Sequence, residues 1–263
     1  MRCALVIAVL AGCRFDPTAA TTPGDARSVD GTMTPQVDAP SPHVDAGFAV
    51  PMLVQAKNPG FTAANALAVT LDLTAGDLLV AATYTSNLVD TLTVTDTSAL
   101  TWTAATAVAT PDEQQPQKGC APALQIWYAP IAATGSDTVT LAQNNTNALG
   151  MELAEYSGIA TATPVDLAGG VVAPASAATA TYAITTTDRD VIVALFGDLN
   201  GTGTMAAGSG LTRRNADNEF YAMYADDVPG VPPGTYDLSA TLPDNGNDNC
   251  WTVAALALRV GTQ

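Results

Sequence analysis

The chain has 263 residues, of which 25 are Asp or Glu and only 9 are Lys or Arg, so its formal net charge is −16. This acidic balance argues against nucleic acid and anionic lipid as partners, because few cationic residues are available to replace the counterions of phosphate groups. The single histidine, His43, lies outside every predicted strand, which removes Ser-His-Asp and Cys-His chemistry and most zinc sites from the folded part.

The first thirteen residues carry one charge, Arg2, and a short apolar run that ends in Leu10-Ala11-Gly12-Cys13. The run is too short to cross a bilayer, which takes about 20 residues, and it is typical of a signal peptide. Its ending resembles the lipobox of bacterial lipoproteins, in which the chain is cleaved before a cysteine that carries acyl chains. The resemblance implies a signal peptide over 1–12, lipidation of Cys13 and an anchor in the outer membrane of the cell envelope, facing the periplasm or the surface. A plain secretory signal and a secreted protein are the alternative.

Residues 13–47 are rich in Pro, Thr, Ala and Asp and show no hydrophobic periodicity. Such a segment cannot bury enough apolar surface to offset the entropy of ordering, so we predict a flexible, disordered tether there. The folded domain is expected over 48–263.

From Phe48 onward, short runs dense in Val, Ile, Leu, Thr and Tyr alternate with Gly, Asn, Asp and Pro, which is typical of β-strands. No run of helical period interrupts them, so the sequence predicts an all-β domain. The expected strands are 66–73, 77–85, 100–109, 123–131, 137–142, 148–156, 180–186, 190–197, 211–215, 219–226, 235–241 and 250–260.

The second series of strands resembles the first. The segment GDLLVA at 76–81 aligns with RDVIVA at 189–194, and IWYA at 126–129 aligns with AMYA at 222–225. These matches predict two internal repeats, about 48–160 and 161–263. Six strands are too few for a separate sandwich, so the repeats are expected to share one core in a single jelly-roll-like β-sandwich of about twelve strands.

Alternation along the strands assigns their faces. In the strand 123–131, Leu124, Ile126 and Tyr128 share the expected core face, whereas Gln125 and Trp127 share the opposite face. The unbroken apolar run 191–196 predicts a central strand that is covered on both sides.

Two cysteines, Cys120 and Cys250, are left in the folded domain once Cys3 leaves with the signal peptide and Cys13 carries lipid. In an exported, oxidising setting they are expected to form one disulfide. Two separate buried thiols are the alternative, because spacing alone does not prove pairing.

Aromatic residues on the faces opposite the core are the candidates for ligand binding, since Trp and Tyr rings form stacking platforms for sugars. Trp102, Trp127 and Gln125 are expected on such faces, and Tyr221 occupies the repeat position that matches Gln125. The alternative is that these side chains close the end of the core or cover a sheet.

The loop DNGNDN at 244–249 clusters oxygen ligands around a glycine, which is the chemistry that Ca²⁺ prefers. Asp244, Asn247 and Asp248 are its candidate ligands. The alternative is an ordinary tight turn, in which Asn, Asp and Gly dominate. No other cofactor is expected.

Paired carboxylates are the remaining catalytic device for a domain without histidine, because a glycosidase needs two acids that face each other. Glu152 and Glu155 are three residues apart and are expected on opposite faces of one strand. Asp188 and Asp190 are expected to cap a turn. The sequence therefore offers no catalytic constellation, and we expect no enzyme.

The segments GDLLVAATYT, LQIWYAPIA, DTVTLA and LAEYSG resemble strands of the Thr- and Ala-rich β-sandwich modules of secreted and surface proteins of bacteria. The resemblance implies an architecture and specifies no active site. Together with the lipid anchor it favours a non-enzymatic envelope protein for adhesion or for binding of a surface glycan or a protein partner. A carbohydrate-active enzyme with paired carboxylates and a structural lipoprotein without a specific ligand are the alternatives.

Overall fold

The computed structural model describes residues 47–86, 90–108, 122–172, 178–198, 204–214, 222–241 and 251–262. These residues form β-strands and connections and no helix, so they contain none that could cross a membrane. The prediction of an all-β sandwich is confirmed. The strands are β1 (Met52–Lys57), β2 (Phe61–Leu73), β3 (Leu78–Thr85), β4 (Leu92–Asp96), β5 (Thr103–Val108), β6 (Ala123–Pro130), β7 (Gly135–Ser157), β8 (Val165–Val172), β9 (Thr179–Thr186), β10 (Asp190–Asp198), β11 (Ala206–Ala207), β12 (Thr212–Arg213), β13 (Ala222–Val231), β14 (Gly234–Thr241) and β15 (Trp251–Arg259).

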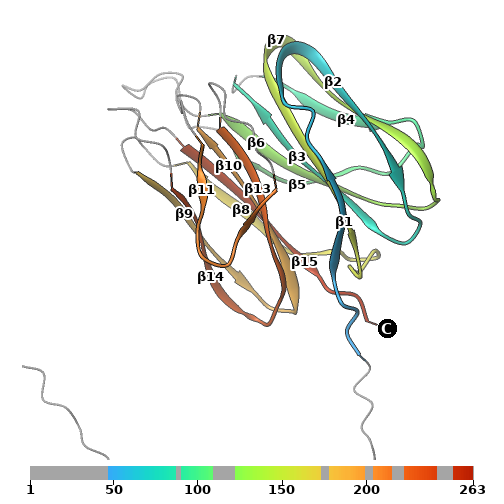
Figure 1. The fold of residues 1–263 in the computed structure, drawn as a ribbon, viewed down its shortest axis with the longest axis vertical. Helices are drawn as coiled ribbons and strands as arrows, with labels where there is room; N and C mark the ends of the chain where they lie inside the picture. The colour runs from blue at the N-terminus through green and yellow to red at the C-terminus, as the bar shows by residue number, and fades with distance from the viewer. Residues whose placement is uncertain are drawn as a thin grey trace, which may run out of the picture. The chain divides into compact units, whose positions relative to one another are not determined.

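Strands β1 to β7 form the first half of the domain, drawn blue to green in Figure 1. Five of them pair in the order β1-β7-β3-β6-β5. β7 is 23 residues long. It also pairs with β2, over residues 135–142 and 147–150, and with β4, over 139–143, and these strands make a second, smaller layer. Because one strand takes part in both layers, all seven strands are joined in a single bent sheet.

Strands β8 to β15 form the second half, drawn yellow to red in Figure 1. The larger sheet has the order β8-β15-β10-β13-β12, and the smaller sheet has the order β9-β14-β11. Here two separate strands, β14 and β15, take the places that the two parts of the long β7 take in the first half. The order of the neighbouring strands within the sheets is otherwise the same in both halves.

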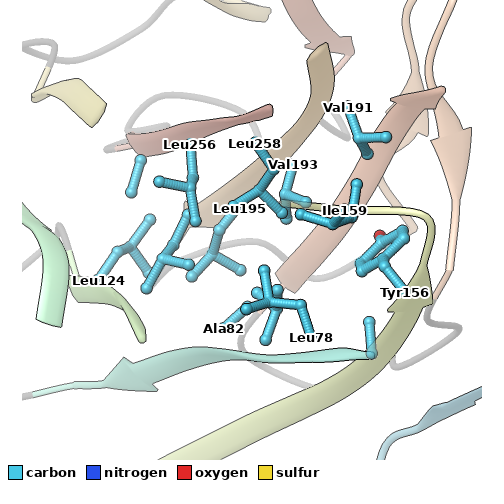
Figure 2. Packing of buried hydrophobic residues seen from close by; sticks show 14 of the residues in the cluster. Leu78, Ala82, Leu124, Tyr156, Ile159, Val191, Val193, Leu195, Leu256 and Leu258 are labelled. Carbon is cyan, nitrogen blue, oxygen red and sulfur yellow. The ribbon is translucent and has the colours of Figure 1, made fainter. Parts of the chain in front are cut away.

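Three hydrophobic cores lie between these layers, and the central strands β3 and β10 each contribute to two of them. In β10, Val191, Val193 and Leu195 point into a core that both halves share, whereas the alternate residues point into a core of the second half alone. Every residue of β10 is buried, so the predicted coverage of the run 191–196 on both sides is confirmed. The shared core (Figure 2) contains Leu78, Val80, Ala82, Tyr84, Leu124, Ile126, Ala154, Tyr156, Ile159, Val191, Val193, Leu195, Ala254, Leu256 and Leu258.

The domain has more layers and more hydrophobic cores than the sequence predicts. The expected single core between two six-stranded halves is present, but each half has a further core between its larger and smaller layers. The difference comes from strands that the sequence pattern does not mark. Four of them, β1, β4, β8 and β11, are short, or lie at a sheet edge, or contain glycines. With these strands each half has enough surface to enclose apolar side chains of its own.

The connection between the halves, residues 158–164, is attached to the end of β15. The amide of Gly261 donates to the carbonyl of Gly158, and the amide of Ala160 donates to the carbonyl of Arg259, at 2.8 and 2.9 Å. The described ends of the chain also meet, because Phe48 and Thr262 form an antiparallel bridge. The backbone therefore enters, changes halves and leaves near the end of β15.

Candidate functional site

Three residues of the predicted site are described, Trp102, Gln125 and Trp127, and all three are half-buried. The predicted lipidation site, the two cysteines of the predicted disulfide, the fourth ligand-binding candidate and the candidate calcium ligands lie outside the described residues. These are Cys13, Cys120, Cys250, Tyr221, Asp244, Asn247 and Asp248.

The two tryptophans are neighbours on one face of the first half. β5 and β6 are antiparallel, and Ala104 lies opposite Trp127. Trp102 precedes Ala104 by two residues, in the connection that leads into β5, and both tryptophans pack against the same core. Gln125 lies two residues from Trp127 on the same face of β6. We call this group, Trp102, Gln125 and Trp127, the Trp face.

The connection between β4 and β5 fixes Trp102. The carboxylate of Asp96 accepts a hydrogen bond of 2.8 Å from the indole Nε1 of Trp102 and bonds of 3.0 and 3.1 Å from the amide of Leu100. The loop is therefore folded around Asp96, and Ala99 within it has a φ of 57°. A ring that is held in this way loses little conformational entropy when it binds a ligand.

Both indoles also pack against the core of the first half. This contact is what the alternative interpretation predicts, in which the rings cover a sheet. Neither tryptophan is fully buried, so the Trp face covers the core and is also partly open to solvent. The Nε1 atom of Trp127 is buried and has no hydrogen-bond partner among the described residues.

Sequence reasoning missed two buried carboxyl pairs, and the first lies at the start of β3. Asp77 is 9 % exposed and lies next to Glu155 of β7. Burial raises the pKa of Asp77 to about 6, and the charge of Glu155 and a hydrogen bond with it add to the effect. Glu155 is fully buried and accepts hydrogen bonds from Nε2 of Gln55, at 2.5 Å, and from the amide of Thr74, at 2.8 Å.

The second pair lies at the start of β10. Asp190 is fully buried next to Asp166 of β8. Burial raises the pKa of Asp190 to about 7, with further contributions from Asp166 and Asp188 that Arg259 opposes in part. Neither side-chain oxygen of Asp190 accepts a hydrogen bond from any described donor. Asp190 can form a hydrogen bond with the neighbouring Asp166 only in its protonated form, and this interaction contributes to the raised pKa of Asp190.

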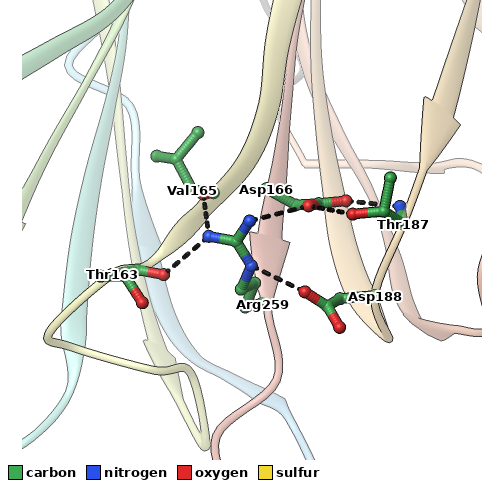
Figure 3. Close-up of polar contacts among 6 residues, drawn as sticks. All are labelled: Thr163, Val165, Asp166, Thr187, Asp188 and Arg259. Carbon is green, nitrogen blue, oxygen red and sulfur yellow. Dashed lines mark hydrogen bonds and ion pairs between the residues drawn. The ribbon is translucent and has the colours of Figure 1, made fainter.

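Arg259 organises the surroundings of this pair (Figure 3). Its Nε donates to Asp188 at 2.8 Å and its Nη2 donates to Asp166 at 2.9 Å. Its Nη1 donates to the backbone carbonyls of Thr163, at 3.2 Å, and of Val165. One guanidinium thus ties the connection between the halves to β8 and to the turn before β10.

The charges of this cluster are mutually stabilised. Burial alone would raise the pKa of Asp166, but hydrogen bonds from the hydroxyl and amide of Thr187 and from Asp190 lower it. The hydrogen bond with Asp188 is the main reason why the pKa of Arg259 is raised. Asp166 therefore loses its proton at lower pH than Asp190, whose pKa is raised.

The expectation that Asp190 caps a turn is wrong, because its side chain is fully buried at the start of β10 and accepts no hydrogen bond from a described donor. A signal was available in the repeat alignment, which places Asp77 and Asp190 at the same position, directly before a buried apolar run. The expected separation of Glu152 and Glu155 agrees with the cores. Their neighbours Leu153 and Ala154 belong to the first-half core and the shared core, respectively.

Within the described ranges, no group of three or more His, Cys, Asp or Glu side chains is placed to hold a metal ion. Comparison with protein-family models, with curated proteins and with solved structures finds no match to the chain.

Proposed function

We propose that the protein is a non-enzymatic, lipid-anchored protein of the cell envelope that binds a surface glycan through the Trp face. The observation that carries this proposal is the pair of half-buried tryptophans, Trp102 and Trp127, which pack against the same core, with Gln125 on the same face of β6 as Trp127. Indole rings stack on the C–H faces of sugars, and an amide offers both a donor and an acceptor to sugar hydroxyls. A protein partner is the competing occupant of the same surface.

The buried carboxyl pairs support a binding protein over the alternative of a paired-carboxylate glycosidase. Glu155 and Asp190 are fully buried, where a sugar ring cannot reach them. Contacts within the fold account for the raised pKa values of Asp77 and Asp190 and for the hydrogen bonds of Glu155. The Trp face lies elsewhere, on β6 and in the connection that leads into β5.

Binding is tested with the purified full chain on a glycan array, followed by a fluorescence titration with the strongest glycan. We expect Trp127→Ala and Trp102→Ala each to weaken binding at least tenfold, about 1.4 kcal/mol, because each removes a stacking ring. Phe48→Ala is the matched control, since Phe48 is 53 % exposed and lies outside the Trp face. Unchanged affinity in both tryptophan variants, or binding to no glycan, would overturn the glycan assignment.

The proposed lipid anchor is inferred from the motif Leu10-Ala11-Gly12-Cys13. After cleavage, the 34 residues between Cys13 and Phe48 would allow the domain to lie roughly 30 Å from the membrane if they behave as a flexible chain. A domain on such a tether can search a surface for its ligand while it stays attached to the envelope.

A disulfide between Cys120 and Cys250 belongs to the same proposal, because exported proteins form such bonds. The hydroxyl of Thr252 donates to the carbonyl of Pro122 at 2.8 Å, and each of these residues follows one of the cysteines by two positions. This contact supports the pairing, since two residues of chain span at most about 7 Å.

One intact-mass measurement on the membrane-extracted protein, expressed with its own N-terminus, tests both modifications. We expect the mass of a chain that begins at Cys13 with diacylglyceryl and acyl groups, and the loss of that added mass in Cys13→Ala. Reduction should add the mass of two hydrogens, and Cys120→Ser should abolish this increment. An unmodified soluble protein would contradict the anchor, and no change on reduction would contradict the disulfide.

We also infer that the two halves are copies of one jelly-roll-like module. The shared order of neighbours in the larger sheets, β1-β7-β3-β6-β5 and β8-β15-β10-β13-β12, supports this inference. The matching places of Asp77 and Asp190 at the start of the central strands support it independently.

A further inference from the structure

The two carboxyl pairs lie on either side of the connection between the halves. Glu155 precedes residues 158–164 by three positions, and Asp166 follows them by two. Their partners, Asp77 and Asp190, stand at the start of the central strands β3 and β10. One carboxyl pair therefore lies near each end of the connection, next to the start of a central strand.

The pairs also adjoin the same end of the shared core. Leu78 and Val191, which follow Asp77 and Asp190 directly, both point into that core, and so does Tyr156, next to Glu155. Figure 2 shows Tyr156, Ile159 and Val191 gathered at one end and Leu124 at the other. A change in the protonation of either pair would therefore affect the contacts between the two halves and residues 158–164, which connect them.

Few positively charged groups lie near Asp77 and Asp190 among the described residues. The charged group that faces Asp77 is Glu155 of β7, and the nearby side chain from β1 is the neutral amide of Gln55. Asp190 faces Asp166 of β8, Asp188 of its own turn and one cation, Arg259 of β15. From β13, the residue opposite Asp190 is the uncharged Val231.

We propose that these pairs form a proton-dependent latch at the junction of the halves, closed while each pair shares a proton and loosened when Asp77 and Asp190 both ionise. In the closed state each pair has one negative charge and one hydrogen bond between its carboxyls. Ionisation replaces that bond with two buried negative charges, which repel each other in surroundings of low dielectric constant. The end of the shared core and the connection then lose a fixed attachment.

The direction of the pH response follows from the raised pKa values. The folded protein holds the two protons more tightly than the unfolded chain, in which Asp titrates near 3.8. The contribution of the pairs to stability is therefore complete in acid and is lost as the pH rises through about 6 for Asp77 and about 7 for Asp190.

The test compares the full chain with the double variant Asp77→Asn/Asp190→Asn, whose amides keep a donor but cannot ionise. In urea unfolding we expect the unfolding equilibrium constant of the natural chain to rise at least about tenfold from pH 5 to pH 8. We also expect faster hydrogen exchange over 155–166 at pH 8, after correction for the intrinsic rate. The double variant should show neither change, and Asp237→Asn, at an exposed carboxylate of β14, should respond as the natural chain does.

Parallel pH profiles of the natural chain and the double variant would overturn the proposal. So would a stability that rises from pH 5 to pH 8, or a loss of protection spread evenly over all strands. If the double variant does not fold, the infrared spectrum of the natural chain tests the proposal instead. A protonated carboxyl band at pH 5 that disappears by pH 8 supports the latch, and absence of that band at pH 5 refutes it.

Discussion

At Gly150 of β7 the fold leaves no room for a side chain. A Cβ placed there would lie 2.5 Å from the ring of Phe61, which stacks edge-on against Tyr84 with ring centroids 5.0 Å apart. We expect Gly150→Ala to destabilise the domain by about 1–3 kcal/mol in urea unfolding, because the Phe61 ring must move out of its packing against the shared core.

Gly135, at the start of β7, is the matched control for this substitution. No atom lies within 4 Å of a Cβ built at that position. Gly135→Ala should leave the stability unchanged or raise it slightly, since alanine restricts the unfolded chain. Equal losses at both positions would show that strand propensity, rather than the contact with Phe61, determines the cost.

Single residues of the candidate site were partly predictable. Trp102, Gln125 and Trp127 follow from residue type and from the alternation along β6, which also places Leu124 and Ile126 correctly in the shared core. The hydrogen bond from Trp102 to Asp96 does not follow, because it depends on how the loop between β4 and β5 folds back. The burial of Asp190 next to Asp166 could not be predicted either, because the two residues come together only when their strands pair.

Among the elements, strands with a continuous buried pattern were predicted well. β3, β6, β9, β10 and β14 agree with the expected ranges to within about one residue at each end. The ranges 137–142 and 148–156 proved to be two parts of β7, because the polar segment between them, 143–147, continues the strand while it changes layers.

The strands that sequence reasoning missed share weak patterns. β8 contains Gly169 and Gly170, β11 has two residues, and β1 follows Pro51 at a sheet edge. An edge strand pairs on one side and packs with fewer neighbours, so selection for a clear apolar alternation is weaker. The number of layers could not be predicted without these strands, which explains why a single core was expected.

For the whole molecule, the shared core predicts one cooperative unfolding transition. The same strands, β3 and β10, form part of the shared core and of the separate core of their own half, so neither half can lose its packing alone. Two variants can report on the halves separately. Trp251→Phe leaves Trp102 and Trp127 in the first half, and Trp102→Phe/Trp127→Phe leaves Trp251 in the second.

We expect the fluorescence transitions of these two variants in urea to coincide after correction for their own stabilities. Leu195→Ala, which removes a fully buried side chain of the shared core, should shift both transitions equally, with a loss of about 2–5 kcal/mol. Two separate midpoints, or a shift confined to the second half, would show that the halves unfold as independent domains.

The bridge between Phe48 and Thr262 has a mechanical consequence. The amide of Ala49 also donates to the carbonyl of Gly261 at 2.8 Å, so the two ends of the described chain are fastened to each other directly. A stretching force applied to the two ends of the described chain would act mainly on this short contact. The sheets themselves would experience little of that force. For the same reason the ends can be joined by a short loop and the chain opened elsewhere, which makes the domain suited to circular permutation.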